Sequence, residues 1–138
     1  MTDKQELRAQ IRAMVAKAQR SLAAARAHLD SGDFDFASGR AYYAAFYCME
    51  AVLLEKGKSY SKHTGVISGF GEHLILPGIF PKDFAKRIAA LFRDRQIGDY
   101  EFGVSISEAD AREDVKHAAL IVRMIADYLQ TMIDSDRR

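Results

Sequence analysis

The sequence lacks the residues that would support disulfide or metal chemistry. It has 138 residues but only one cysteine, Cys48, and no tryptophan. A single cysteine excludes a disulfide within the chain and a metal site of the Cys-x-x-Cys type. Because Cys48 lies in an apolar run, we expect it to be a small core residue rather than a reactive thiol.

An excess of charge of one sign is also lacking. The chain has 20 basic and 19 acidic residues, which give a net charge of +1. This balance argues against a broad basic surface and against strong nonspecific binding to nucleic acid. A local positive site remains compatible with the composition.

Long uncharged runs are missing as well. The first residues, MTDKQELRAQIRAM, are charged and show no signal peptide. The least charged stretch, 36–54, still contains Arg40 and Glu50, so it indicates a buried helix rather than a membrane span. We therefore expect a cytoplasmic protein without membrane association. With 49% hydrophobic residues, the chain can form one folded domain, residues 1–138.

Apolar residues recur at steps of three and four, the period of helices. The pattern predicts helices over 3–30, 34–56 and 62–76, a fourth that opens at Pro81, and a last one that starts at Ser107. No strand pattern appears. The fold class predicted is all-α, a four-to-five-helix up-and-down bundle.

The second predicted helix is apolar on nearly all sides, which places it at the centre of the bundle. The last helix keeps an unbroken apolar stripe, typical of a helix seated in a bundle or against a partner chain. In the weaker third helix, Gly65 and Gly69 share one face. We expect a neighbouring helix to approach closely there.

Three groups of residues are candidates for a ligand site. The four histidines have no metal-ligand spacing, so no metal or cofactor is expected. Lys62, His63 and Thr64 open a helix and could hold a phosphate, while simple capping by Ser61 is the alternative. The aromatic block of the second helix could stack bases, although packing in the core or a dimer is favoured. Its members are Tyr42, Tyr43, Phe46 and Tyr47.

The third candidate is the segment RQIGDYEF, residues 95–102. Arg95 continues an apolar stripe, so its guanidinium is predicted to point inward, where it needs an acidic partner. Asp99 is within reach if the helix continues past Gly98, and Glu50 is another candidate. Together with Tyr100, these residues could form a structural network or bind a phosphate and a ribose hydroxyl. Arg40 and Glu50 are expected to belong to a structural polar network.

Two stretches of the chain resemble the HEPN domain family over roughly residues 5–133. They are FASGRAYYAAFYCMEAVLLEKGKSYSKHTGVISGFGEHLI and LFRDRQIGDYEF. The resemblance implies a helical bundle that forms a homodimer, in a setting of nucleotide or RNA chemistry. It also implies a minimal nucleotidyltransferase as partner, in a toxin–antitoxin pair.

Catalytic members of the family are metal-independent ribonucleases whose motif is an arginine followed, after four to six residues, by a histidine. The motif's arginine falls on Arg95, but its histidine position falls near Asp99, and no histidine occurs before His117. An aspartate accepts a proton but donates one only when its pKa is strongly raised.

The hypothesis favoured by the sequence is therefore a dimeric nucleotide- or RNA-associated binding module, the partner of a nucleotidyltransferase. One alternative is a ribonuclease toxin that uses Arg95 with Asp99, Tyr100 or a recruited histidine such as His63. A second alternative is a structural dimer that binds no ligand.

Overall fold

The computed structural model describes residues 2–102 and 106–136, and every regular element in these ranges is helical. This confirms the predicted all-α bundle. The elements, in chain order, are α1 (Asp3–Asp30), α2 (Phe34–Glu55), α3 (His63–Phe70), the π-helical turn η1 (Gly71–Ile75), α4 (Phe84–Tyr100) and α5 (Glu108–Asp136). Homodimer formation stays a prediction.

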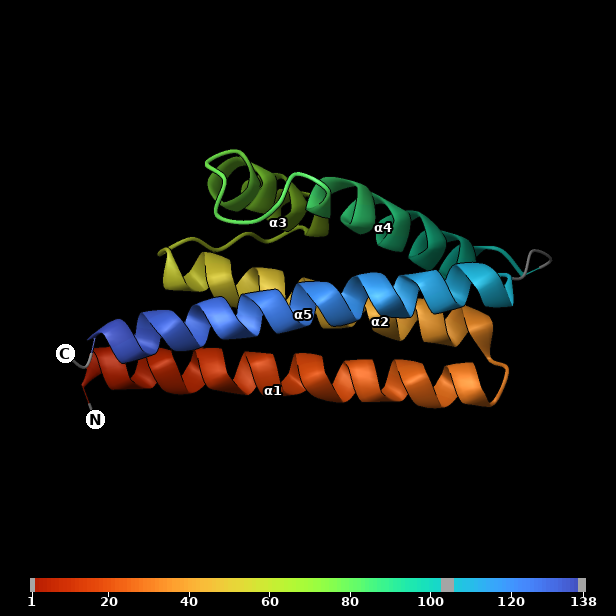
Figure 1. Ribbon diagram of the computed structural model, residues 1–138, viewed down its shortest axis with the longest axis horizontal. Coiled ribbons are helices and arrows are strands. Elements are labelled where there is room, and N and C mark those ends of the chain that lie inside the picture. The colour runs from red at the N-terminus through yellow and green to blue at the C-terminus, as the bar shows by residue number, and fades with distance from the viewer. Residues whose placement is uncertain (1, 103–105, 137–138) are drawn as a thin grey trace.

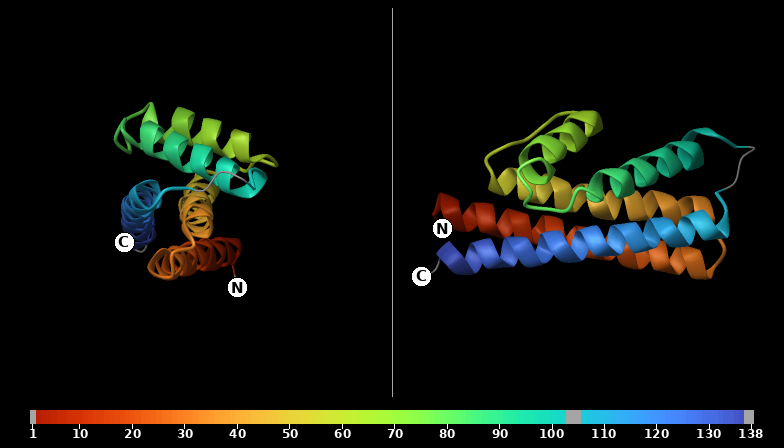
Figure 2. Two further views of the ribbon diagram at one scale, coloured as in Figure 1. Left: turned by 90° about the vertical axis from the view of Figure 1, so that its right-hand side faces the viewer. Right: turned by 45° about the horizontal axis from the view of Figure 1, so that its top comes forward.

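Three long helices, α1, α2 and α5, lie side by side, and α3 and α4 form a shorter layer over them (Figure 1). Viewed end-on in Figure 2, α2 is the central element, with α5 on one flank, α1 below and the α3–α4 layer above. The small residues of α2 account for this position, because Ala37, Ala41 and Ala45 are buried and let neighbouring helices approach.

Turn chemistry sets the helix ends. Gly32 and Gly57 follow α1 and α2 with φ of 82° and 77°, a conformation that favours glycine. At the start of α5, the Ser107 hydroxyl accepts a 3.1 Å hydrogen bond from the Asp110 backbone N–H and so caps the helix.

The structure corrects the expected start of α4. The helix begins at Phe84 rather than at Pro81, because a turn closed by the Phe84 N–H and the Pro81 carbonyl, at 3.1 Å, precedes it. At its other end α4 continues through Gly98 to Tyr100. Gly98 faces α2 there, and a Cβ on it would lie 3.3 Å from the Asp35 backbone oxygen. This glycine therefore permits close packing instead of ending the helix.

The expectation for Gly65 and Gly69 was wrong in its detail. Both glycines face the Tyr60 side chain rather than another helix. A Cβ on Gly69 would lie only 2.5 Å from the Tyr60 hydroxyl oxygen. The glycines make room for an aromatic ring that lies along α3.

Two other features complete the description of the core. Cys48 is fully buried, and burial raises the pKa of its thiol to about 12, so it packs as a small apolar residue. Within residues 2–102 and 106–136, no helix combines the length and the apolar character that crossing a membrane requires.

Candidate anion-binding site

Arg95 lies on the buried side of α4, as its place in the apolar stripe predicted. Phe84, Ile88 and Leu91 on the same side are buried, and only 14% of the Arg95 side chain is exposed. A guanidinium this far from water needs partners for its charge and its N–H groups.

Asp99 and Tyr43 supply those partners. The Nη2 group of Arg95 donates a 2.9 Å hydrogen bond to the Tyr43 hydroxyl on α2. Its Nε atom lies 2.9 Å from Asp99 Oδ2, one helical turn along α4. This N–H is buried and has no hydrogen-bond partner, so the contact with Asp99 is an ion pair without an aligned hydrogen bond. Arg95 thus retains donor capacity.

The charge of Arg95 is stabilised by aromatic rings and by its polar partners. Its guanidinium carbon lies 5.3 Å from the centre of the Tyr42 ring and 5.5 Å from that of Tyr43, within cation–π range. Burial acts to lower the pKa of Arg95, but the Tyr43 hydrogen bond and the Asp99 carboxylate outweigh it, and the pKa lies above its ordinary value. Arg95 is therefore a permanent cation.

His63, the first residue of α3, joins the same cluster. Its Nδ1 shares a 3.0 Å hydrogen bond with the Tyr42 hydroxyl, and its ring stacks on Phe46 with the centroids 4.2 Å apart. Burial, reinforced by the positive charge of Arg95, lowers the pKa of His63. Burial also raises the pKa of Tyr42 to about 12. At neutral pH the cluster therefore contains a neutral imidazole beside a protonated phenol.

One side of α2 is open to solvent next to this cluster. The half-exposed residues of its central part recur at helical spacing and mark that side: Arg40, Tyr43, Tyr47, Glu50 and Leu54. In the end-on view of Figure 2, no described helix flanks α2 opposite α5.

Cations lie over the aromatic rings along this open side. The Arg40 guanidinium carbon is 4.9 Å from the centre of the Tyr43 ring, and Lys17 Nζ of α1 is 4.8 Å from that of Tyr47. The face that borders Arg95 is thus aromatic and positively charged.

The other predicted ligand residues lie outside this cluster. Tyr100 ends α4 with 70% of its surface exposed. Lys62 and Thr64 flank His63 but are exposed, and Thr64 lines a separate groove between α3 and α4. The N-cap of α3 is Lys62, not Ser61, and no side chain caps it. Of the predicted residues, the structure brings together Arg95, Asp99 and His63.

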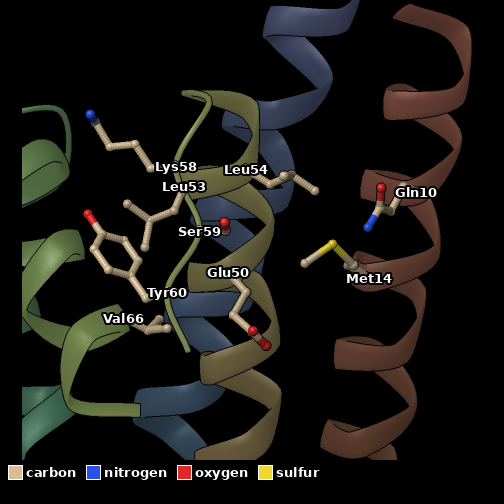
Figure 3. A pocket seen from close by; sticks show the side chains of 9 residues that line it. All are labelled: Gln10, Met14, Glu50, Leu53, Leu54, Lys58, Ser59, Tyr60 and Val66. Atoms are coloured by element: carbon tan, nitrogen blue, oxygen red, sulfur yellow. The ribbon is translucent and has the colours of Figure 1, made fainter. Parts of the chain in front are cut away.

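Arg40 and Glu50 occupy different halves of α2 and form no ion pair with each other in the described structure. Glu50 points into the space between α2 and α1, beside Gln10 and Met14 (Figure 3). Burial raises the pKa of Glu50, while Lys17 acts in the opposite direction. Arg95 has Asp99, not Glu50, as its acidic partner.

Arg112 and His117 fit the letters of an Arg-x4-His motif but point to different partners. Arg112 Nε forms a 2.9 Å ion pair with Glu108, and His117 Nδ1 lies 3.0 Å from Arg87 on α4. They form no common site. In the described part of the chain, no group of three or more histidine, cysteine or acidic side chains is placed to hold a metal ion.

Sequence reasoning missed the role of Tyr42 and Tyr43 as direct partners of His63 and Arg95. The signal available was the adjacent pair in YYAAFY, because neighbouring helix residues point about 100° apart and can reach two different helices. Here Tyr42 contacts α3 and Tyr43 contacts α4.

The chain is therefore an all-α helical-bundle protein that carries an arginine–aromatic cluster between α2, α3 and α4. The particular family follows from comparison with known proteins: residues 11–129 match the HEPN domain, and the chain belongs to this family. A UPF0332 protein of Gloeobacter violaceus is 36% identical over 114 residues, 82% of this chain and 90% of the relative. A Methanocaldococcus jannaschii protein, provisionally named a toxin, is 28% identical over 128 residues, 93% of this chain and 95% of the relative.

Solved structures show the same fold. A crystal structure of a Thermus thermophilus protein superposes with a TM-score of 0.73 at 18% identity, covering 86% of this chain and 97% of that one. The crystal structure of an archaeal HEPN homologue superposes with a TM-score of 0.69 at 20% identity, with the same coverage of both chains. At these identities the likeness concerns the fold alone.

Proposed function

We propose that this HEPN protein binds the phosphate of a nucleotide or of RNA at Arg95, as one member of a toxin–antitoxin-like pair. The observation that supports this most directly is the guanidinium of Arg95, which Tyr43 holds in place beside the aromatic, cation-lined open side of α2. A phosphate oxygen is an acceptor that suits such a planar, preorganised cation.

The neighbourhood of Arg95 fits a nucleotide as well as a bare phosphate. Tyr43 is half-exposed and has Arg40 over its ring, so a base can approach an aromatic, cationic surface. Asp99, 44% exposed, can accept from a ribose hydroxyl. In this proposal the protein works as a homodimer and has a minimal nucleotidyltransferase as partner. The toxin-like names of two relatives support the paired setting.

Titration calorimetry with AMP and with a short single-stranded RNA tests the binding proposal. Arg95→Ala should weaken either ligand by about tenfold or more, since hydrogen bonds to charged groups are each worth about 1.5–3 kcal/mol. Arg112→Ala is the matched control, because Arg112 is an exposed arginine paired with Glu108 on α5. Absence of binding by the unmodified protein, or equal loss in both variants, would contradict the proposal.

A second candidate function is a metal-independent ribonuclease, and the position of His63 favours it. His63 shares the aromatic pocket of Arg95 and has a lowered pKa, so at neutral pH it can accept a proton. Incubating labelled tRNA and mRNA with the protein and with a His63→Ala variant tests this function. RNA left intact by the unmodified protein at high concentration would exclude it.

A further inference from the structure

Two carboxyl groups are buried in the interior, where α4 packs on α5. Asp94 on α4 is 4% exposed and Asp114 on α5 is 1% exposed. After burial, the neighbouring Asp94 is the largest cause that raises the pKa of Asp114, so the two carboxyls lie close together where α4 packs on α5. Neither residue takes part in the cluster described above, and burial of two adjacent carboxylates is strongly unfavourable unless they share a proton.

The surrounding groups do not supply enough positive charge to keep both carboxyls ionised. From α4, Arg93 Nε lies 3.1 Å from Asp94 Oδ1, but 65% of the Arg93 side chain is in solvent. From α2, the Ser38 hydroxyl donates a 2.8 Å hydrogen bond to Asp114 Oδ2. Asp114 therefore has a neutral donor and no cation of its own among the described ion pairs.

The remaining charges nearby act against ionisation or are neutral. Asp110 on α5 adds negative charge. His117, also on α5, has a pKa lowered by burial and by Arg87. Its imidazole is therefore neutral at any pH above the ordinary histidine pKa, near 6.5. Burial and the nearby Asp94 carboxylate raise the pKa of Asp114 to about 8. One shared proton would satisfy the group, with Asp114 as donor to Asp94 and with Arg93 and Ser38 donating to the oxygens that remain.

We propose that the proton shared by Asp94 and Asp114 positions α4 so that Arg95 meets Tyr43, which makes Asp114 a positioning residue for the anion site. Asp94 and Arg95 are neighbours on α4, so their side chains leave the helix about 100° apart. Asp94 is held by α5, and Arg95 contacts α2. A rotation of α4 about its axis therefore moves both contacts together.

Loss of the shared proton places two like charges in the interior and drives α4 away from α5. The Arg95–Tyr43 hydrogen bond then loosens, and the anion site loses its preorganised guanidinium. Regulation of ligand binding in this way rests on the proposed function, which supplies the ligand. The coupling between the carboxyl pair and Arg95 is a property of the protein alone, so it can be measured without any ligand.

The first measurement follows two NMR signals while the pH is raised from about 6.5 to about 9.5, the range in which a raised carboxyl titrates. One is the carboxyl carbon of Asp114, and the other is the side-chain Nε–H of Arg95, assigned from an Arg95→Lys sample. We expect the two signals to move with a common midpoint. An Arg95 signal that stays still while Asp114 titrates would overturn the proposal.

Variants separate positioning from simple stability. Asp114→Asn keeps a donor for Asp94 and an acceptor for Ser38, so it imitates the protonated state, and its Arg95 signal should become independent of pH. Glu113→Gln, on the exposed side of α5 and paired with Lys116, should retain the wild-type pH profile. If Asp114→Asn does not fold, Asp94→Asn provides the test, since loss of the neighbouring charge should lower the midpoint of both signals. An Arg95 profile that either folded variant leaves unchanged would overturn the proposal.

AMP affinity between about pH 7 and pH 9 supplies the functional readout, because the phosphate is already dianionic there. We expect about threefold or greater weakening in the wild type, corresponding to about half a unit or more on the logarithmic scale, and none in Asp114→Asn. Coupled NMR signals without AMP binding at any pH would support the positioning proposal and contradict the proposed function. Arg95-dependent AMP binding that is constant with pH would support the proposed function and contradict the positioning proposal.

Discussion

Arg95 of α4 donates a 2.9 Å hydrogen bond to the hydroxyl of Tyr43 on α2. This bond links the helix that was predicted to hold the site to the central helix of the bundle. It also holds the guanidinium against an aromatic ring, so that Tyr43 both directs the Arg95 side chain and stabilises its charge.

Removal of this hydroxyl should make the Arg95 side chain more mobile without creating a cavity in the core. We expect Tyr43→Phe to lower the free energy of unfolding by about 1 kcal/mol, because the ring remains and one hydrogen bond to a charged group is lost at a half-exposed position. Urea denaturation measures the change. Tyr47→Phe is the control, since Tyr47 lies on the same side of α2 and contributes its ring to Lys17. Equal losses in the two variants would contradict a specific role for the Tyr43 hydroxyl.

The pKa of His63 reports on the charge of Arg95. Burial and that charge both lower it, so Arg95→Gln, which removes the charge but retains similar bulk, should raise the pKa of His63 towards its ordinary value near 6.5. Histidine ring signals in an NMR titration would measure this shift. Arg112→Gln, whose charge lies on the exposed side of α5, should leave the His63 titration where it is. A His63 pKa that stays unchanged in Arg95→Gln would show that the charge of Arg95 does not act on the imidazole.

The contact of Tyr60 with α3 makes two nearby glycines respond oppositely to alanine. Gly69→Ala should lower the free energy of unfolding by about 1–3 kcal/mol, because a Cβ would overlap the Tyr60 ring. Gly71→Ala should be neutral or stabilising by up to about 1 kcal/mol, since its Cβ would meet nothing within 4 Å and its backbone is helical.

A double-mutant cycle tests the cause of the Gly69 effect. In a Tyr60→Ala background the ring is gone, so Gly69→Ala should cost little. Thermal unfolding of the four proteins gives the coupling energy. A full Gly69→Ala penalty that persists without Tyr60 would mean that another neighbour sets it.

The parts of the fold that depend on local pattern could be predicted from the sequence. Helical periodicity placed Arg95 on the buried side of α4, and the spacing made Asp99 one of two candidate ion partners, the other being Glu50; the structure shows Asp99. The meeting of Arg95, Tyr43 and His63 could not be predicted, because it depends on how α2, α3 and α4 pack, and these residues are far apart in sequence. The same reason explains Gly69: the pattern showed that something approaches closely but not that it is a side chain.

The burial of Asp114 could be predicted from the sequence, but its contact with Asp94 could not. Asp114 stands three residues after Ala111 and one before Val115, so the helical period places it among buried positions of α5. The pattern therefore contained the sign of a buried carboxyl. Its partner Asp94 belongs to another helix, and only the packing of α4 on α5 shows that the two share an environment.

The shared proton of this pair also predicts how stability changes with pH. In the folded chain the pKa of Asp114 is about 8, whereas an unfolded aspartate titrates near 3.9. Between these values the folded state holds a proton that the unfolded state has lost, so stability falls as the pH rises. The contribution is fully present below the unfolded pKa and is lost as the pH passes through the folded one.

Urea denaturation above about pH 6.5 isolates the effect of Asp114. The half-buried histidines His63 and His117 have lowered pKa values, so they reduce stability only when the pH falls below their unfolded pKa, near 6.5. We expect the wild-type urea midpoint to fall between pH 6.5 and about pH 8.5. Asp114→Asn should flatten this slope, and Glu113→Gln, an exposed change on the same helix, should keep it. A wild-type midpoint that does not fall over this range would mean that Asp114 is already ionised in the folded protein, because the folded and unfolded states would then bind the same number of protons.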